Sequence, residues 1–208
     1  MIILGFSSIC LFLSTTCKAT CMSTCPIGDR ADLLSYLDDY FSAPSATHVC
    51  GDISTWDVSN VTDFSNLFED RADFNANISN WDTSRVTTLY HTFYQASAFN
   101  GDLSSWDTSS VTRLYGTFWG ASAFNGDVST WETSEVTNME HTFRVAPEFN
   151  GDLSNWTTSK VTTMVCAFTG AEKFNGNVSN WDTSRVTTME QTFMQASAFN
   201  GDVSSWDT

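Results

Sequence analysis

Basic residues are scarce in this sequence. Its 208 residues include 9 lysines and arginines against 24 aspartates and glutamates, and the formal net charge is −15. A surface this negative repels the phosphates of DNA and RNA and the headgroups of anionic lipids. We therefore exclude nucleic-acid binding, and we regard cationic partners or divalent cations as more natural ligands.

Long apolar runs are also missing. The only one lies within residues 1–19, and it is shorter than the about 20 residues that a membrane-spanning helix needs. It ends at Cys17-Lys18-Ala19, where small residues suit a signal peptidase. We predict a signal peptide over residues 1–19 and a secreted or cell-surface protein without membrane insertion after cleavage. An uncleaved anchor is the alternative, because no lysine or arginine precedes the apolar run.

Cleavage would leave Cys21, Cys25, Cys50 and Cys166. An oxidising compartment favours one disulfide near the N-terminus. Cys25 with Cys50 is the preferred pair, because this bond would tie the start of the mature chain to the first repeat, and Cys21 with Cys50 is the alternative. Cys166 stands in a repeat position that other residue types fill elsewhere, so we read it as a tolerated variant.

Tryptophan marks an internal repeat with a period of 25 residues. Seven tryptophans keep this spacing: Trp56, Trp81, Trp106, Trp131, Trp156, Trp181 and Trp206. A unit this short cannot bury its own apolar face and must stack on its neighbours. We predict an N-terminal cap over residues 20–50 and a solenoid of about six repeats over residues 51–208. Because the sequence stops in mid-repeat, we expect a longer array, or end-to-end association, to cover the last repeat.

The cap is expected to contain a helix from Asp29 to Ser42. Its apolar residues follow helical spacing, as Leu33, Leu37 and Phe41 show, and Asp29 is a suitable N-cap. An amphipathic helix directly before a repeat array would cover the open apolar end of the first repeat.

Within each repeat, the pattern predicts one short helix and one short strand. Val111, Leu114, Phe118 and Ala121 are spaced three, four and three residues apart, which is typical of one helical face. Residues 127–131 follow an Asn-Gly turn and predict an extended piece that pairs in parallel with its copies. The predicted fold class is therefore an α/β repeat.

The aromatic columns are expected to form the core of the stack. The tryptophans and two phenylalanines recur once in every repeat, and each aromatic side chain buries 150–250 Å² on average. Trp119 has no copies, so we expect it to be exposed. An asparagine column from Asn75 to Asn200 is interpreted as a buried ladder of amides. The glycine after it is replaced by Ala76, which would strain the first repeat if the position needs a positive φ.

Two acidic columns, represented by Asp102 and Asp107, are the main candidates for chemistry. Stacked carboxylates either bind a cation such as Ca²⁺ or accept local hydrogen bonds. Asparagine and threonine replace some of these acids, as at Asn77 and Thr157, and they keep hydrogen-bonding capacity without the charge. We therefore favour a structural role in turns, and Ca²⁺ is the only cofactor that the sequence leaves open.

Catalytic constellations are not found. His91 and His141 are two repeats apart, roughly 10 Å at the spacing of adjacent strands, and His48 lies in the cap. No serine sits in a nucleophile elbow, and no glycine-rich phosphate loop occurs. The sequence predicts a protein that is not an enzyme.

The segment Phe99 to Thr112, Phe-Asn-Gly-Asp-Leu-Ser-Ser-Trp-Asp-Thr-Ser-Ser-Val-Thr, resembles the repeat of BspA-like leucine-rich-repeat surface proteins. The resemblance covers about residues 30–208, with departures at Glu132 and Thr157. It implies a right-handed, leucine-rich-repeat-like solenoid and an extracellular binding or adhesion role without catalytic residues.

We predict that variable positions of the repeat bind an extracellular protein or glycan. They alternate in charge and include local aromatics, as a recognition surface does. The predicted binding face consists of Asn60, Arg85, Ser110, Glu135, Lys160, Arg185, Tyr90, Tyr94, Tyr115 and Trp119.

An alternative function is binding to ice or a mineral surface through threonine or aspartate ladders. Two threonine columns qualify, one from Thr62 to Thr187 and one from Thr83 to Thr183. Such binding requires a flat and exposed ladder, whereas threonine beside a helix start has a simpler explanation as a cap.

Overall fold

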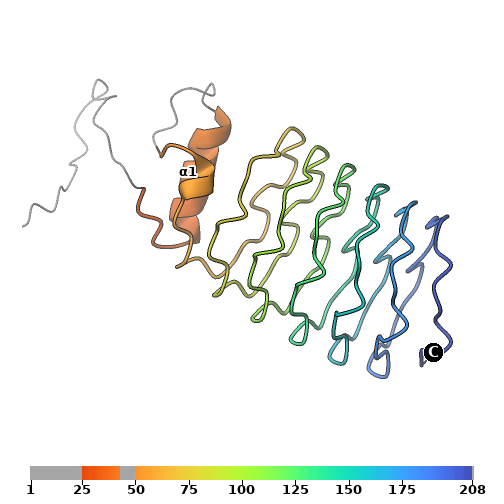
Figure 1. Ribbon diagram of the computed structural model, residues 1–208. Helices are drawn as coiled ribbons and strands as arrows, with labels where there is room; N and C mark the ends of the chain where they lie inside the picture. Colours follow the sequence, from red (N-terminus) through yellow and green to blue (C-terminus); the bar gives the residue numbers. More distant parts are fainter. Residues whose placement is uncertain (1–24, 43–49, 208) are drawn as a thin grey trace, which may run out of the picture.

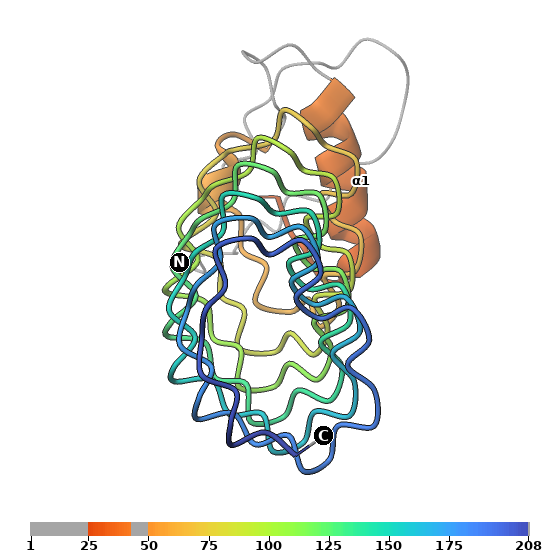
Figure 2. The same ribbon diagram turned by 90° about the vertical axis from the view of Figure 1, so that its right-hand side faces the viewer.

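A computed structural model describes residues 25–42 and 50–207 of the chain. It contains the helix α1 (Arg30–Ser42), the 3₁₀ turn η1 (Ile53–Thr55) and a row of similar coils (Figure 1). Viewed from the end of the row, the coils have similar outlines and are displaced stepwise from one another (Figure 2). We number coils 1 to 6 as residues 51–75, 76–100, 101–125, 126–150, 151–175 and 176–200. The predicted signal peptide, Cys21 and His48 lie outside the described residues.

Helix α1 lies where the apolar spacing predicts it and packs on coil 1. The Asp29 carboxylate caps its first turn by accepting from the backbone N–H groups of Ala31 and Asp32, at 2.8 and 3.0 Å. Leu33 and Leu37 are buried. At the end of the helix, the Phe41 ring meets the rings of coil 1 edge-on. Within the described residues, no helix is long and apolar enough to cross a membrane.

A disulfide joins Cys25 to Cys50, with their Cα atoms 5.3 Å apart. It ties the residues before α1 to the start of coil 1, and it is the pair preferred from the sequence. Cys166 is a free and buried thiol.

The predicted fold class is wrong. Within the described residues, α1 and the 3₁₀ turn η1 of coil 1 are the only helices, and coils 2 to 6 carry neither the short helices nor the short strands of a leucine-rich-repeat-like α/β solenoid. Parallel pairing is limited to isolated bridges between single residues of successive coils: Asp63, Thr88, Arg113, Asn138, Thr163 and Thr188. Each coil is a chain of turns held to its neighbours.

Left-handed residues explain why residues 111–121 do not form a helix. Gly116 and Gly120 have φ of 58° and 77°, outside the right-handed helical region. The N–H of Gly116 donates to Glu140 O of the next coil at 2.9 Å, and the N–H of Phe118 donates to Thr142 O at 2.8 Å. Backbone donors that a helix would use within itself therefore join successive coils.

The predicted extended piece is also a turn. The Ser129 N–H donates to the Asp127 carboxylate at 2.9 Å, and the Trp131 N–H donates to Val128 O at 3.1 Å. The same bond, from a serine N–H to the side-chain oxygen two residues before it, recurs at Asp52, Asn77, Asp102, Asp152, Asn177 and Asp202. These hydrogen bonds lower the pKa of Asp102 below its ordinary value, because they stabilise the ionised carboxylate. The structural role of this column in turns is confirmed.

The aromatic columns form the core as predicted. Phe118 is fully buried and stacks on Phe124, with ring centroids 3.8 Å apart. Above and below it, Phe93 and Phe143 lie 5.4 Å away. The indole N–H of Trp131 donates to Leu103 O of the preceding coil at 3.2 Å, and its copies make the same bond. Each tryptophan therefore contributes both apolar area and a polar link between coils.

The asparagine ladder exists, but it is exposed rather than buried. The Asn125 N–H donates to the side-chain oxygen of Asn100 at 2.8 Å, and this bond recurs along the column. The glycines after these asparagines do not have positive φ, so the need for glycine has another cause. A Cβ built on Gly126 would lie 2.6 Å from the carbonyl oxygen of Gly101.

We predict that Gly126→Ala lowers the free energy of unfolding by about 2 kcal/mol, because the added Cβ would meet the Gly101 carbonyl, a backbone group that cannot move aside easily. Gly101→Ala is the matched control: both Cβ atoms would meet the preceding phenylalanine ring at 2.9 Å, but the carbonyl of Ala76 is 3.9 Å away. Urea unfolding of the two variants measures the difference. Equal loss in both would show that the coil spacing is not the cause.

Candidate functional site

The variable column of the predicted binding face is fully exposed. All six residues, Asn60, Arg85, Ser110, Glu135, Lys160 and Arg185, lie on the surface. Two neighbouring pairs bond along the column: Arg85 donates to the Asn60 side chain at 3.2 Å, and Lys160 pairs with Glu135 at 2.6 Å. These side chains are available to a partner, although some already contact each other.

The four aromatics of the predicted face form one cluster over coils 2 and 3. Tyr90 stacks on Tyr115 with centroids 5.1 Å apart and planes 15° apart. Tyr94 meets Trp119 edge-on at 5.1 Å. All four side chains are half-buried. Trp119 is therefore less exposed than the sequence predicts.

Three residues that the sequence analysis did not include complete the cluster. His91 stacks on Tyr94 at 4.6 Å, and His141 lies 4.7 Å from Trp119. The Arg144 guanidinium covers the Trp119 ring at 4.8 Å, a cation–π contact. Trp119 therefore connects the two histidines, which the sequence analysis had separated as two repeats apart.

The glycines of coil 3 make room for this cluster. A Cβ built on Gly116 would lie 2.4 Å from the His91 ring, and one on Gly120 would lie 2.7 Å from the Gln95 side chain. The side chains of coil 2 therefore lie over bare backbone of coil 3. Copies of Gly116 in other coils carry side chains, as His141 and Cys166 do.

Burial sets the charge state of the cluster. It lowers the pKa of His91, although Glu69 at 3.6 Å favours the protonated ring. Burial and the Arg144 charge lower the pKa of His141. Burial, with the nearby Tyr90 and Glu140, raises the pKa of Tyr115, so its hydroxyl stays protonated at neutral pH.

The cluster is particular to these coils and does not follow from the repeat. The column of Tyr90 and Tyr115 continues with Glu140, Val165 and Glu190. The column of Tyr94 and Trp119 continues with Arg144, Thr169 and Met194. Arg113 forms one of the isolated β-bridges between coils, and it is exposed. It lies two positions before Tyr115, and Leu114 between them is buried. We call Tyr90, Tyr94, Arg113, Tyr115, Trp119 and Arg144 the aromatic–arginine patch.

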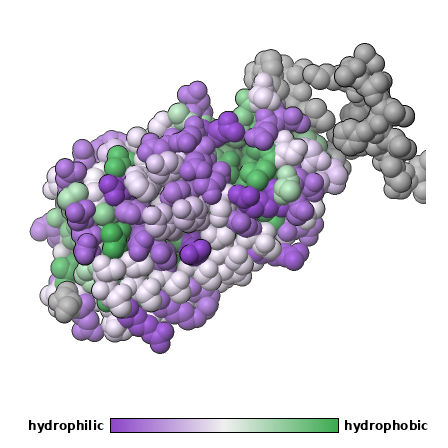
Figure 3. Space-filling view, turned by 180° about the vertical axis from the view of Figure 1, so that it is seen from behind, coloured by the Kyte–Doolittle hydropathy of each residue, from purple (hydrophilic) through white to green (hydrophobic). Residues whose placement is uncertain are grey.

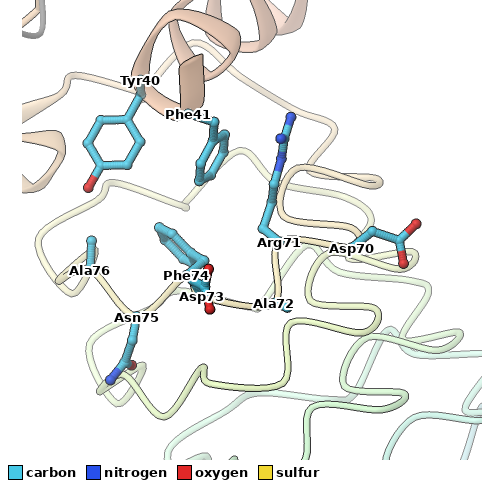
Figure 4. A pocket seen from close by; sticks show the side chains of 9 residues that line it. All are labelled: Tyr40, Phe41, Asp70, Arg71, Ala72, Asp73, Phe74, Asn75 and Ala76. Atoms are coloured by element: carbon cyan, nitrogen blue, oxygen red, sulfur yellow. The ribbon is translucent and has the colours of Figure 1, made fainter. Parts of the chain in front are cut away.

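A pocket of about 600 Å³ lies between the end of α1 and the turn 70–76 of coil 1 (Figure 4). Tyr40 and Phe41 form one side, and Arg71 covers the Phe41 ring at 4.2 Å. The turn 70–76 forms the floor of the pocket. The copies of this turn in later coils are each covered by the preceding coil. The pocket is therefore the partly covered front of the stack. The face in Figure 3 is mostly hydrophilic, and its largest hydrophobic group lies towards this same end.

Metal-binding geometry is not found among the described residues, where no three His, Cys, Asp or Glu side chains come together around one point. The acidic columns instead use their carboxylates as turn acceptors, as in the Ser109 to Asp107 bond at 2.9 Å. A Ca²⁺ ion would have to displace or share these bonds.

The two threonine columns differ in exposure. Thr83 and its copies are buried, with Thr83 3% exposed, so this column cannot present a surface. Thr87 and its copies are exposed, but their hydroxyls donate to the carbonyl of the preceding threonine, as Thr87 does to Thr62 at 3.1 Å.

The chain belongs to the family described as Mycoplasma protein of unknown function, DUF285, which it matches over residues 36–151 and 126–208. No curated protein and no solved structure matches the chain.

Proposed function

We propose that this DUF285 protein is a secreted or cell-surface scaffold that binds a protein or glycan without catalysing a reaction. The observation that carries the proposal is the aromatic–arginine patch. Tyrosine, tryptophan and arginine are the residues that contribute most to binding energy at protein interfaces. Here they lie half-exposed on a regular scaffold, at positions that other coils fill with unrelated residues.

Other features support an extracellular location. Disulfides such as Cys25–Cys50 form and persist mainly in oxidising compartments. The net charge of −15 favours solubility and disfavours nucleic acid as a partner. The resemblance of the repeat to BspA-like surface proteins points the same way.

Trp119→Ala tests the proposal. Trp119 contacts Tyr94, His141 and Arg144, so its removal opens the centre of the patch. We expect binding of the purified protein to arrayed extracellular proteins and glycans to fall by about tenfold or more. Met194→Ala is the matched control, because Met194 is the exposed copy of Trp119 in the last full coil.

The thermal unfolding midpoint of both variants identifies any loss that is due to misfolding. If Trp119→Ala binds every ligand of the native protein equally well while remaining folded, the patch is not the binding site.

Ice or mineral binding is the weaker proposal, because the exposed threonine hydroxyls are already used between coils. Thermal hysteresis of the purified protein would support it.

A further inference from the structure

The rings of the patch partly cover one another's faces. Tyr90 and Tyr115 cover one face of each other, and Arg144 covers the Trp119 ring. The Tyr94 ring meets Trp119 at 83°, edge to face. A sugar ring stacks on an open aromatic face, whereas a polypeptide can use ring edges and hydroxyl groups. The arrangement therefore favours a polypeptide over a glycan.

Polar groups of the patch are free to bind. Within residues 25–42 and 50–207, the hydroxyls of Tyr90, Tyr94 and Tyr115 and the guanidinium of Arg113 have no hydrogen-bond partner. The guanidinium of Arg144 is less available, because its Nε is buried and its Nη1 lies 3.5 Å from His141 Nδ1. Stacked rings hold the hydroxyls in place, so binding would cost little conformational entropy.

The two arginines of the patch form no ion pair in the described part of the chain. Four cations form ion pairs elsewhere: Arg30 with Asp63, Arg71 with Asp38, Lys160 with Glu135 and Lys173 with Glu148. Arg85, Arg113, Arg144 and Arg185 form no ion pair in the described part of the chain, and the first three lie in coils 2 to 4.

The two acids at the edge of the patch are already engaged. Glu69 contacts His91 and accepts from the Asn66 amide. Glu140 accepts from the Thr163 hydroxyl at 2.8 Å. These bonds leave both carboxylates charged, so a ligand would meet the two arginines at the patch and the two acids at its edge.

We propose that the aromatic–arginine patch binds a short acidic segment of a partner polypeptide, in contrast to the cationic partners that the net charge of −15 favours for the chain as a whole. This inference rests on the proposed function and specifies its ligand. Carboxylates of the segment accept from Arg113, Arg144 and the tyrosine hydroxyls, and these charge-assisted bonds are stronger than neutral ones. The patch spans two coil steps, about 10 Å at the spacing of adjacent strands, which matches about three residues of an extended peptide.

Selection from a displayed library of random 12-residue peptides on the purified full chain tests the proposal. We expect selected peptides to be enriched in adjacent Asp and Glu residues. A fluorescein-labelled selected peptide, measured by anisotropy, should bind about tenfold more weakly to the double variant Arg113→Gln/Arg144→Gln and more weakly at higher salt. Tyr115→Phe keeps the ring stack, and removal of its hydroxyl should weaken binding about threefold or more.

Lys173→Gln is the control, since it removes one positive charge from an exposed side chain outside both the patch and the predicted binding face, and it should change affinity less than twofold. Neutral or basic selected peptides, no selected peptides, or equal affinity of the double variant would each overturn the proposal.

Polygalacturonate serves as an acidic glycan probe. If it binds and loses affinity in Trp119→Ala while no peptide is selected, the proposed function stands and this inference fails. If neither probe binds and the arrayed ligands also fail, both are wrong.

Discussion

Phe118→Ala is expected to lower the free energy of unfolding by about 4 kcal/mol, because it opens a cavity in the middle of the stack. Phe118 is fully buried and touches rings on four sides: Phe124 at 3.8 Å, Phe93 and Phe143 at 5.4 Å, and Trp131 at 5.9 Å. Coils contact mainly their nearest neighbours, so a loss in coil 3 weakens both of its interfaces.

Urea unfolding measures the loss in the free energy of unfolding. Hydrogen exchange shows which coils lose protection. Phe193→Ala is the matched control, because Phe193 is the copy of Phe118 in coil 6 and is only half-buried. We expect it to cost about half as much, since less of its ring area is removed from water. A loss that is the same at both positions would mean that stacking between coils does not stabilise the column.

The core and the cap are readable from the sequence because both depend on side-chain spacing. A tryptophan every 25 residues comes to lie over its own copies, as Trp131 and Trp156 do at 6.2 Å, and its indole N–H reaches the preceding coil as at Trp131. Leu33 and Leu37 fix the buried face of α1 by the same kind of regularity. Neither conclusion depends on the backbone conformation between the repeats.

The secondary structure of the repeats could not be read from the same spacing. Apolar residues three and four apart, such as Val111, Leu114 and Phe118, also arise when successive tight turns point every third or fourth side chain inward. The decisive signal is the conformation of Gly116 and its copies. Their identities vary, and His91 and His141 adopt the same left-handed φ, so glycine alone would not have revealed it.

The aromatic–arginine patch and the histidines beside it are only partly readable from the sequence. Trp119 and the tyrosines stand out as aromatics that break the repeat, whereas Arg144, His91 and His141 are of residue types that are common on protein surfaces. Reading columns at a period of 25 places Arg144 directly after Trp119. The orientation of the rings, and therefore which groups face outward, depends on packing that a sequence pattern does not contain.

Loss of the Cys25–Cys50 disulfide is expected to cost about 3 kcal/mol, because the bond closes a loop of 25 residues and restricts the unfolded chain. The double variant Cys25→Ala/Cys50→Ala removes it, and urea unfolding measures the loss. Comparison in a Cys166→Ala background prevents exchange with the buried free thiol. Cys166→Ala alone is the control.

The effect should begin at α1. Without the bond, this helix is held on coil 1 by its buried leucines and by the edge-on contacts of Tyr36 and Tyr40 with Trp56. Hydrogen exchange should therefore accelerate first in residues 30–42 and coil 1, while coil 4 keeps its protection, since each coil depends mainly on its neighbours. Uniform acceleration along the chain would instead show that the stack unfolds as one unit and that the bond acts only through the unfolded state.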